Sequence, residues 1–207
     1  MSTSESTLQS ASFAAASIQD FLHALAAKSP TPGGGAVAAL VGAIAAAQAQ
    51  MVVEYSVGKK SLAPHQALLL DYRGRLERMR LLFLRLMDED AAAYAQLSPW
   101  LKLPATERDS TADFHAALTA ALRAPQSVLA LANELLDYCR ALIPITNPAL
   151  ASDLGVAQDA AAACGRSALR NVEINLPLLS DIEAQARERA ITDELSSHMR
   201  KLVSAMA

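Results

Sequence analysis

Residues 29–53 read SPTPGGGAVAALVGAIAAAQAQMVV, a glycine turn that leads directly into an alanine-rich apolar run. Two prolines restrict the backbone before the turn, and the consecutive glycines Gly33, Gly34 and Gly35 leave it without side chains. The pattern predicts a helix over residues 35–57 that is apolar on nearly every side, as at the centre of a helical bundle. We reject a membrane span because alanine is only mildly hydrophobic and the run has no basic flank on its N-terminal side.

The glycine turn is also a candidate binding site. The first backbone N–H groups of a helix have no partner within it, and the helix dipole places positive charge at that end. Such a turn can hold an anion or a carbonyl-rich ring system. It matches neither the dinucleotide fingerprint nor the phosphate loop, because no later glycine is in register and no Lys-Ser/Thr pair follows. A tight turn with a helix packed closely behind it is the alternative interpretation.

The composition predicts an all-α protein. Hydrophobic residues make up 52% of the 207 residues and aromatic residues only 4%, and runs of β-branched residues are nearly absent. We expect a single domain over residues 17–207, a bundle of long antiparallel helices around the alanine-rich helix, after a flexible lead over residues 1–16. The other helices are predicted over residues 17–28, 64–97, 107–123, 125–143 and 150–175, with a last one from Leu176 onward.

Charge and cysteine content restrict the class of partner. A formal net charge of -3 argues against nucleic acid or an anionic membrane as the main partner and favours a small ligand. The arginines from Arg73 to Arg85 are interpreted as a solvated or salt-bridged surface. Cys139 and Cys164 lack the spacing of metal ligands or of a disulfide framework, so no metal is expected. The first seventeen residues lack the basic start and apolar core of a targeting peptide, which predicts a cytoplasmic protein.

A carboxylate interrupts an apolar stripe in the predicted helix over residues 64–97. The apolar residues recur at spacings of three and four: Leu69, Tyr72, Leu76, Met79, Phe83 and Leu86. The next position on the stripe is Asp90, and Tyr94 and Leu97 follow it. Burying an unpaired carboxylate costs several kcal/mol, roughly, so such a residue is paired, hydrogen-bonded or placed in a cleft for chemistry. Asp88 lies about 200° away around the helix and need not share its role.

Other polar residues stand out by their positions. Asn171 and Asn175 continue a stripe of small apolar residues, so their amides need partners on a neighbouring helix or in a pocket. Asp153 lies in the first turn of the same predicted helix, where capping is the default explanation. Lys59 and Lys60 follow the end of the alanine-rich helix. They either complement the helix dipole or contact the carboxylates of a ligand.

Seven short motifs occur in an order that resembles one known family. They are SPTPGGGAVAAL (29–40), GKK (58–60), DEDA (88–91), KLP (102–104), NP (147–148), SDLGVA (152–157) and NVEINL (171–176). Together they resemble the cyclodeaminase domain of formiminotransferase-cyclodeaminase and its free-standing bacterial relatives, over nearly everything after Ser17. Two positions depart from the family pattern. Glu54-Tyr55-Ser56 stands where relatives usually carry Asn-Leu-Thr, and Glu173 stands where an arginine is common.

The resemblance implies an all-helical homodimer that acts on one-carbon adducts of tetrahydrofolate and binds no other cofactor. One known reaction, a step of histidine degradation, closes 5-formiminotetrahydrofolate to 5,10-methenyltetrahydrofolate with loss of ammonia. We expect this cyclodeaminase activity. Two alternatives stay open: a cyclohydrolase that converts 5,10-methenyltetrahydrofolate to the 10-formyl compound, and a non-catalytic folate-binding or assembly module.

The resemblance also implies roles for the candidate residues. Asp90 is expected to be the general acid/base, with Asp88 as the less favoured holder of that role. Burial on the apolar stripe would raise the pKa of Asp90 towards neutrality, so that its acid and base forms are both available. The folate ring system is expected to contact Gly33, Gly34, Gly35, Asp153, Asn171 and Asn175, and its glutamate tail Lys59 and Lys60.

Overall fold

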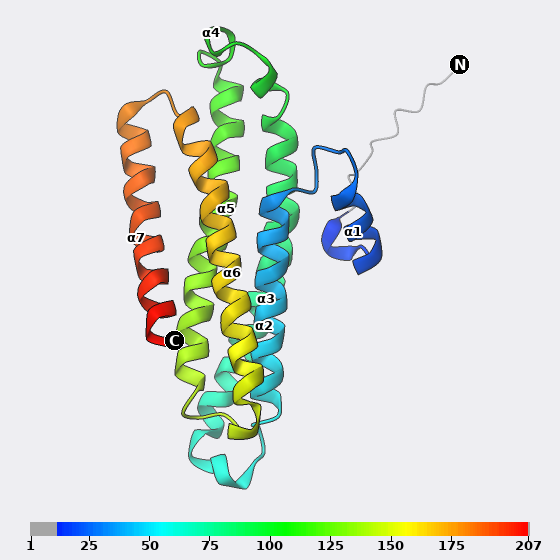
Figure 1. The fold of residues 1–207 in the computed structure, drawn as a ribbon, viewed down its shortest axis with the longest axis vertical. Coiled ribbons are helices and arrows are strands. Elements are labelled where there is room, and N and C mark those ends of the chain that lie inside the picture. Colours follow the sequence, from blue (N-terminus) through cyan, green and yellow to red (C-terminus); the bar gives the residue numbers. More distant parts are fainter. Residues whose placement is uncertain (1–11, 207) are drawn as a thin grey trace, which may run out of the picture.

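The protein is a bundle of helices (Figure 1). The computed structural model describes residues 12–206, and no strand occurs among them. The α-helices are α1 (Ile18–Ala26), α2 (Gly34–Glu54), α3 (Gln66–Leu97), α4 (Ala105–Arg108), α5 (Ala112–Leu142), α6 (Ala151–Asn175) and α7 (Ile182–Met206). Short 3-10 helices are η1 (Phe13–Ala15), η2 (Lys60–His65), η3 (Trp100–Lys102), η4 (Pro148–Leu150) and η5 (Leu176–Leu178). The predicted all-α class is confirmed.

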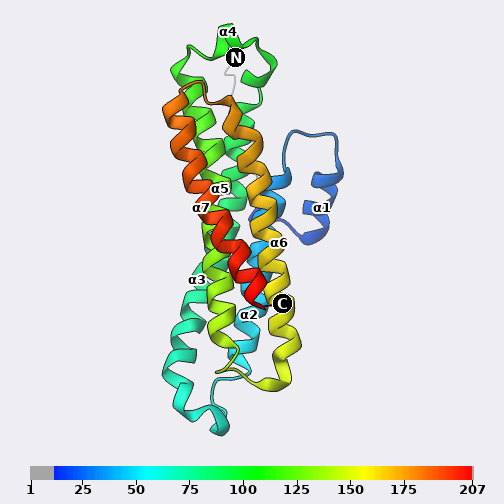
Figure 2. The same cartoon turned by 60° about the vertical axis from the view of Figure 1, so that its left-hand side comes forward.

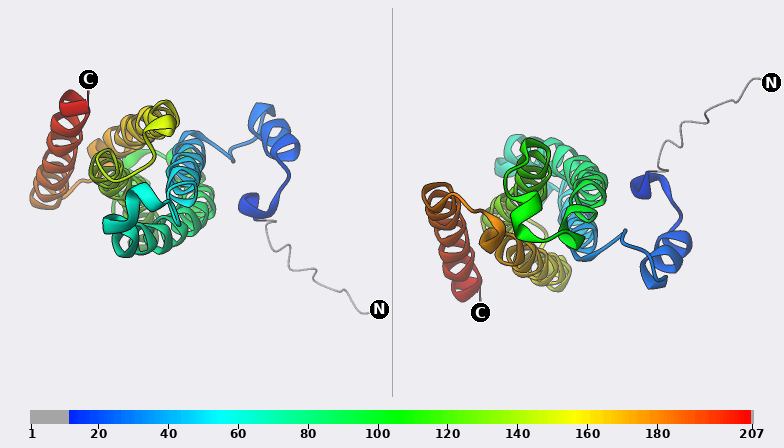
Figure 3. Two further views of the ribbon diagram at one scale, coloured as in Figure 1. Left: turned by 90° about the horizontal axis from the view of Figure 1, so that it is seen from below. Right: turned by 90° about the horizontal axis from the view of Figure 1, so that it is seen from above.

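Four long helices form the body of the bundle. Helix α2 packs on α3 and α6, and α5 packs on the same two helices from the opposite side. Successive long helices run in opposite directions, as predicted (Figures 1 and 2). Helix α7 lies outside this body against α5, and α1 stands apart from it on the other flank (Figure 3).

Helix α2 is the central helix that the alanine-rich sequence predicted. Most of its residues are buried, and their small size lets α3 and α6 approach closely. At Gly42 a side chain would overlap the ring of Phe83 from α3. By length and composition α2 is the one helix among residues 12–206 that could cross a membrane. Its apolar surface is instead largely enclosed by the bundle.

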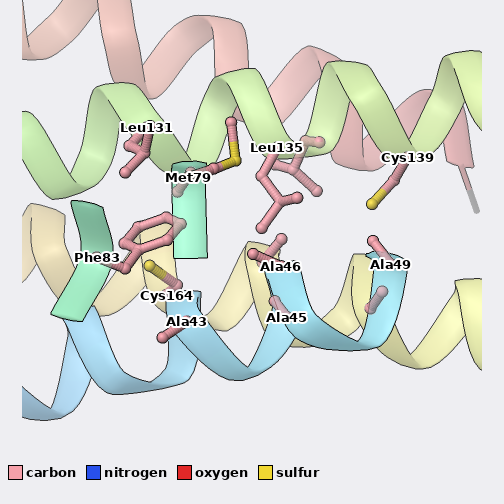
Figure 4. Close-up of a cluster of buried hydrophobic side chains, with 14 of the residues drawn as sticks. Ala43, Ala45, Ala46, Ala49, Met79, Phe83, Leu131, Leu135, Cys139 and Cys164 are labelled. Atoms are coloured by element: carbon pink, nitrogen blue, oxygen red, sulfur yellow. The ribbon is translucent and has the colours of Figure 1, made fainter. Parts of the chain in front are cut away.

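The core contains the apolar stripe of α3. Five of its six residues are buried and Tyr72 is partly buried. Figure 4 shows Met79 and Phe83 of this stripe against α5 and the alanines of α2. Cys139 and Cys164 lie in the same cluster as free, buried thiols, and burial raises the pKa of each to about 12. They are therefore packing residues, unsuited to nucleophilic chemistry.

Two predicted helix boundaries are wrong. The helices expected over residues 107–123 and 125–143 are one continuous helix, α5, with Pro125 inside it. Proline normally breaks a helix because the carbonyl four residues earlier loses its donor. Here another helix supplies that donor, as described below. The last helix begins at Ile182, where the carboxylate of Asp181 accepts from the N–H groups of Glu183 and Ala184.

The chain before α1 lies partly against the bundle. Residues 1–11 of the predicted lead lie outside the described part of the chain. The remainder includes η1, which contacts α3, and the rings of Phe13 and Phe21 meet edge to face with centroids 6.1 Å apart. Residues 13–15 are thus held on the bundle.

Candidate active site

A cavity of about 270 Å³ opens at the end of the bundle where α2 begins. The loop before α2 forms one wall, and α3, α5 and α6 supply the others. The lining residues are Pro30, Thr31, Gly33, Gly34, Gly35, Asp90, Ala91, Tyr94, Ala121, Asn171, Ile174 and Asn175. The structure therefore brings six of the predicted site residues together: Gly33, Gly34, Gly35, Asp90, Asn171 and Asn175.

The glycine turn packs its backbone onto the polar side chains of the pocket. A Cβ built at Gly35 would overlap the carboxylate of Asp90, and one at Gly34 would lie 3.2 Å from Oδ1 of Asn171. Gly33, the N-cap of α2, has no side chain that could cap the helix. The carboxylate of Asp90 instead accepts from the backbone N–H of Ala36 in the first turn, and the N–H groups of Gly34 and Gly35 have no acceptor within the helix. The glycines are needed because the carboxylate and the amide occupy the space that side chains would fill.

Asp90 supplies a carboxyl group to the pocket. Its carboxylate is largely shielded from water between α3 and the start of α2, and desolvation raises its pKa from 3.8 to about 6. A hydrogen bond from the backbone N–H of Ala36 opposes part of this increase. A carboxyl group with a pKa near 6 exchanges a proton readily at neutral pH, which is the property required of a general acid/base.

The two asparagines present carbonyl oxygens to the pocket. Nδ2 of Asn171 donates to the carbonyl of Ser167 at 2.8 Å, and Nδ2 of Asn175 donates to the carbonyl of Ala121 at 3.1 Å. One of the two N–H groups of each amide is thus engaged with backbone, and this bond fixes the orientation of the amide, whose Oδ1 can accept a hydrogen bond. Together with Asp90 they form a set of acceptors, suited to a ligand that carries N–H donors.

Tyr94 and Ile174 form apolar parts of the pocket that the sequence analysis did not assign. Tyr94 is 40% exposed and Ile174 is 71% exposed, although both are large and apolar. Tyr94 lies one helical turn after Asp90, and Ile174 stands between the two asparagines. These spacings could have indicated that both residues belong to the pocket, because side chains three or four positions apart lie on the same face of a helix.

Asp88 lies outside the pocket and holds the N-terminal segment. Its carboxylate accepts from the hydroxyl of Ser12 and from the backbone N–H groups of Phe13, at 2.8 Å, and Ala14, at 3.3 Å. Three donors on one carboxylate anchor η1 on α3. The position of Asp88 therefore favours a structural role over the catalytic alternative considered from the sequence.

Lys59, Lys60 and Asp153 lie at the opposite end of the bundle from the pocket. The lysines follow α2, whose 21 residues span about 30 Å. Both are exposed. Asp153 lies in the first turn of α6 and accepts from Nε2 of Gln48 at 3.1 Å. Within one copy of the chain, these three predicted residues are not part of the pocket.

The other polar residues were compared with the ligand sets that metals require. Among residues 12–206, no three His, Cys, Asp or Glu side chains gather as metal ligands would. Of the two positions that depart from the family pattern, Glu54 lies 3.9 Å from Arg73 and Glu173 is exposed on α6. Neither lines the pocket.

Comparisons with known proteins show which family the chain belongs to. The family model for formiminotransferase-cyclodeaminase matches residues 17–194. The chain is 32% identical over 176 residues to methenyltetrahydrofolate cyclohydrolase of Methylorubrum extorquens, covering 83% of this chain and 84% of that protein. It is 31% identical over 170 residues to formimidoyltransferase-cyclodeaminase of Rattus norvegicus, covering 80% of this chain but only 31% of the rat protein.

A solved structure shares the fold. The crystal structure of formiminotetrahydrofolate cyclodeaminase from Thermotoga maritima superposes with a TM-score of 0.75 at 27% sequence identity. The match covers 93% of this chain and 98% of that one. With the family model matching most of the sequence, the chain belongs to the formiminotransferase-cyclodeaminase family.

Proposed function

We propose that the chain is a cyclodeaminase that closes 5-formiminotetrahydrofolate to 5,10-methenyltetrahydrofolate and releases ammonia. The observation that carries this proposal is the position of Asp90, whose pKa is raised to about 6, between the glycine turn and two carbonyl acceptors. The family relatives named above, a cyclohydrolase and cyclodeaminases, support a folate one-carbon substrate.

The reaction needs one proton to move between two nitrogens. N10 attacks the amidinium carbon and forms a tetrahedral carbon bonded to N5, N10 and the departing nitrogen. The carboxylate of Asp90 takes the proton from N10 and gives it to the departing nitrogen, which leaves as ammonia. The positive charge then resides on the methenyl bridge between N5 and N10. Asp90 returns to its ionised form, so no other acid or base is consumed.

The chemistry of the pocket matches the ring system of the substrate. A reduced pterin carries several N–H groups, which pair with the carbonyl oxygens of Asn171 and Asn175. Its flat ring pairs with the exposed apolar surfaces of Tyr94 and Ile174. A volume of about 270 Å³ suits the ring and the reacting carbon, and leaves the aminobenzoyl-glutamate tail outside.

The cyclohydrolase is the second candidate. The Methylorubrum relative named for this activity matches the chain over 84% of its own length, which favours it. In this reaction water attacks the methenyl carbon, and Asp90 takes a proton from the water and transfers it to N5 as the bond between N5 and that carbon breaks. The product is the 10-formyl compound, and the second water proton is released.

Two substrates and two readouts test the proposal. Purified protein is mixed with 5-formiminotetrahydrofolate or with 5,10-methenyltetrahydrofolate, while methenyl absorbance and ammonia are followed. Absorbance that rises together with ammonia supports the cyclodeaminase. A fall in absorbance from added methenyl compound alone identifies the cyclohydrolase. Tight folate binding without turnover would identify the non-catalytic module. Asp90→Asn is the control that should bind folate without turnover.

The resemblance also leads us to propose that the chain acts as a homodimer. Measurement of its molar mass in solution by light scattering tests this state directly. A mass near twice 21.9 kDa is expected.

A further inference from the structure

We infer that the protein carries a second binding site, for a small uncharged carboxamide, where α5 ends and α6 begins. A cavity of about 210 Å³ lies there, at the lower end of the bundle in Figure 1. Gln158 of α6 lines this cavity, and Asn171 of the same helix lines the candidate active site. Helix α6 rises about 20 Å between these two residues. The second site is therefore separate from the candidate active site and does not depend on the proposed function.

A buried hydrogen-bond donor in the wall of this cavity has no partner. Nε2 of Gln158 is buried, and no group among residues 12–206 accepts a hydrogen bond from it. Other glutamines of the bundle are satisfied within the chain: Nε2 of Gln48 donates to Asp153 at 3.1 Å, and Nε2 of Gln185 donates to backbone carbonyls. An amide that is taken out of water without a new partner destabilises the fold. Such a group in the wall of a cavity indicates a ligand that would pair with it.

The amide of Gln158 matches the polar head of a carboxamide. The last torsion of a glutamine side chain is broad and roughly two-fold, so rotation of the amide can bring Nε2 to the cavity that the side chain lines. One edge of the amide then presents both an N–H donor and a carbonyl acceptor. The corresponding edge of a primary carboxamide presents the complementary carbonyl and N–H. The two groups therefore pair through two hydrogen bonds.

A second polar group favours the same class of ligand. The hydroxyl of Thr146, which lines the cavity, donates to the carbonyl of Leu142 at 2.8 Å. Because its hydrogen is engaged there, its oxygen can only accept, and a primary carboxamide has a second N–H to donate to it. Among residues 12–206, none of those that line the cavity carries a charge. A carboxylate or an ammonium group would therefore lose its water in this cavity without gaining a counter-charge.

Apolar residues and a rigid turn complete the site. Ile143, which is 55% exposed, and Leu154, which is buried, both line the cavity and suit a short hydrocarbon body. The turn at Asn147 forms part of the wall, and its backbone N–H donates to Oγ of the buried Ser56 at 2.9 Å. Oδ1 of Asn147 also accepts from the N–H of Ala149 at 3.3 Å. These bonds hold the wall in place before a ligand binds, which lowers the cost of binding.

Three probes of one shape test the class of ligand. Cyclohexanecarboxamide, cyclohexanecarboxylate and protonated aminomethylcyclohexane share a ring and differ in the polar head. Each is titrated into the unmodified, isotope-labelled protein at neutral pH, and its dissociation constant is taken from the chemical shifts of the amide groups. The carboxamide should bind at least about tenfold more tightly than either ion, because the ions are desolvated without compensation. Equal affinities would overturn the proposal. So would the absence of a saturable shift with any probe, which would leave only water in the cavity.

Two leucine variants test the position of the site. Gln158→Leu removes the donor and the acceptor but keeps the approximate size of the side chain. The dissociation constant of cyclohexanecarboxamide should therefore rise at least about tenfold. The melting temperature of this variant without ligand should be kept or raised, because the buried N–H that lacks a partner is gone. Gln96→Leu is the matched control and should bind as the unmodified protein does, since Gln96 is exposed on α3 and does not line the cavity.

Unchanged affinity in Gln158→Leu would place the ligand elsewhere and refute the inference. The titration of the three probes uses the unmodified protein, so it decides the class of ligand even where a variant does not fold. Neither measurement depends on turnover, so a failure of the proposed function would leave the second site standing.

Discussion

The side-chain amide of Asn175 donates to the carbonyl oxygen of Ala121 at 3.1 Å. Ala121 is four residues before Pro125, so proline leaves that carbonyl without its helical donor. One bond thus satisfies a backbone group that α5 cannot satisfy itself and fixes the orientation of a pocket residue on α6. It also explains how α5 continues through Pro125.

Replacing Pro125 by Ala should let α5 satisfy the carbonyl of Ala121 itself and so release the side chain of Asn175. The substituted alanine would offer its backbone N–H to the carbonyl of Ala121 and compete with Asn175, whose amide would lose its fixed orientation. We expect kcat/KM to fall about tenfold, about 1.4 kcal/mol, while the melting temperature is kept or raised because proline is unfavourable within helices. Asn175→Ala is the companion variant and should lose at least as much activity. Unchanged kcat/KM in Pro125→Ala would show that this bond does not position Asn175 for turnover.

The helices could be predicted from the sequence because their apolar residues repeat at helical spacing. The same repeat identified Asp90, since a carboxylate on a buried stripe needs an explanation. It could not reveal that α5 passes through Pro125, because the donor that permits this comes from another helix. The periodicity of a sequence assigns a residue to a face of its helix. Whether that face lines a pocket depends on which helices pack around it, so the sequence analysis did not assign Tyr94 and Ile174 to the site.

The placement of the lysines could have been anticipated in part. A helix of about twenty residues separates its two ends by about 30 Å, which already puts Lys59 far from the glycine turn in one copy. Motifs of one family can therefore lie at opposite ends of one chain, as the glycine turn and Lys59 do here.

Replacing Gly35 by Ala should disable the pocket. The added methyl group would overlap the carboxylate of Asp90 and push it from its position. We expect kcat to fall at least about a hundredfold with a modest loss of stability, about 1–3 kcal/mol, typical of overpacking. Gly74→Ala is the control, because a Cβ there meets only Nη1 of Arg78, at 3.4 Å. It should keep full activity. Circular dichroism confirms folding, and equal kcat in the two variants would contradict this account.

Replacing Asp88 by Ala should release the segment before α1 from α3 and have little effect on turnover. The variant loses the acceptor for Ser12, Phe13 and Ala14, so the segment before α1 should exchange amide hydrogens and be cleaved by proteases faster. Turnover should fall far less than in Asp90→Asn. Hydrogen exchange of residues 13–15 and kcat are the two measurements. A loss of kcat as large as that of Asp90→Asn would restore Asp88 as a catalytic candidate.

The pH profile of kcat/KM should report the carboxyl group of Asp90. Its ionised form takes the first proton, and its pKa is raised to about 6. Activity should therefore fall about tenfold for each pH unit below that value and level off above it. Asp90→Glu moves the carboxylate but keeps the group, so a residual rate with a shifted midpoint is expected. A profile that is flat from about pH 5 to about pH 8 would exclude Asp90 as the base.

Asp90 should also reduce the stability of the protein at neutral pH. Folding raises its pKa from 3.8 to about 6, so the folded state binds this proton more tightly than the unfolded state. The contribution of Asp90 to the free energy of unfolding is then greatest below about pH 4, and decreases as the pH rises to about 6. The whole shift corresponds to up to about 3 kcal/mol. Asp90→Asn removes the buried charge, so its melting temperature should match that of the unmodified protein near pH 4 and exceed it at pH 7. Melting curves across this range measure the difference, and a variant that is less stable at pH 7 would show that the ionised carboxylate is stabilised in its pocket.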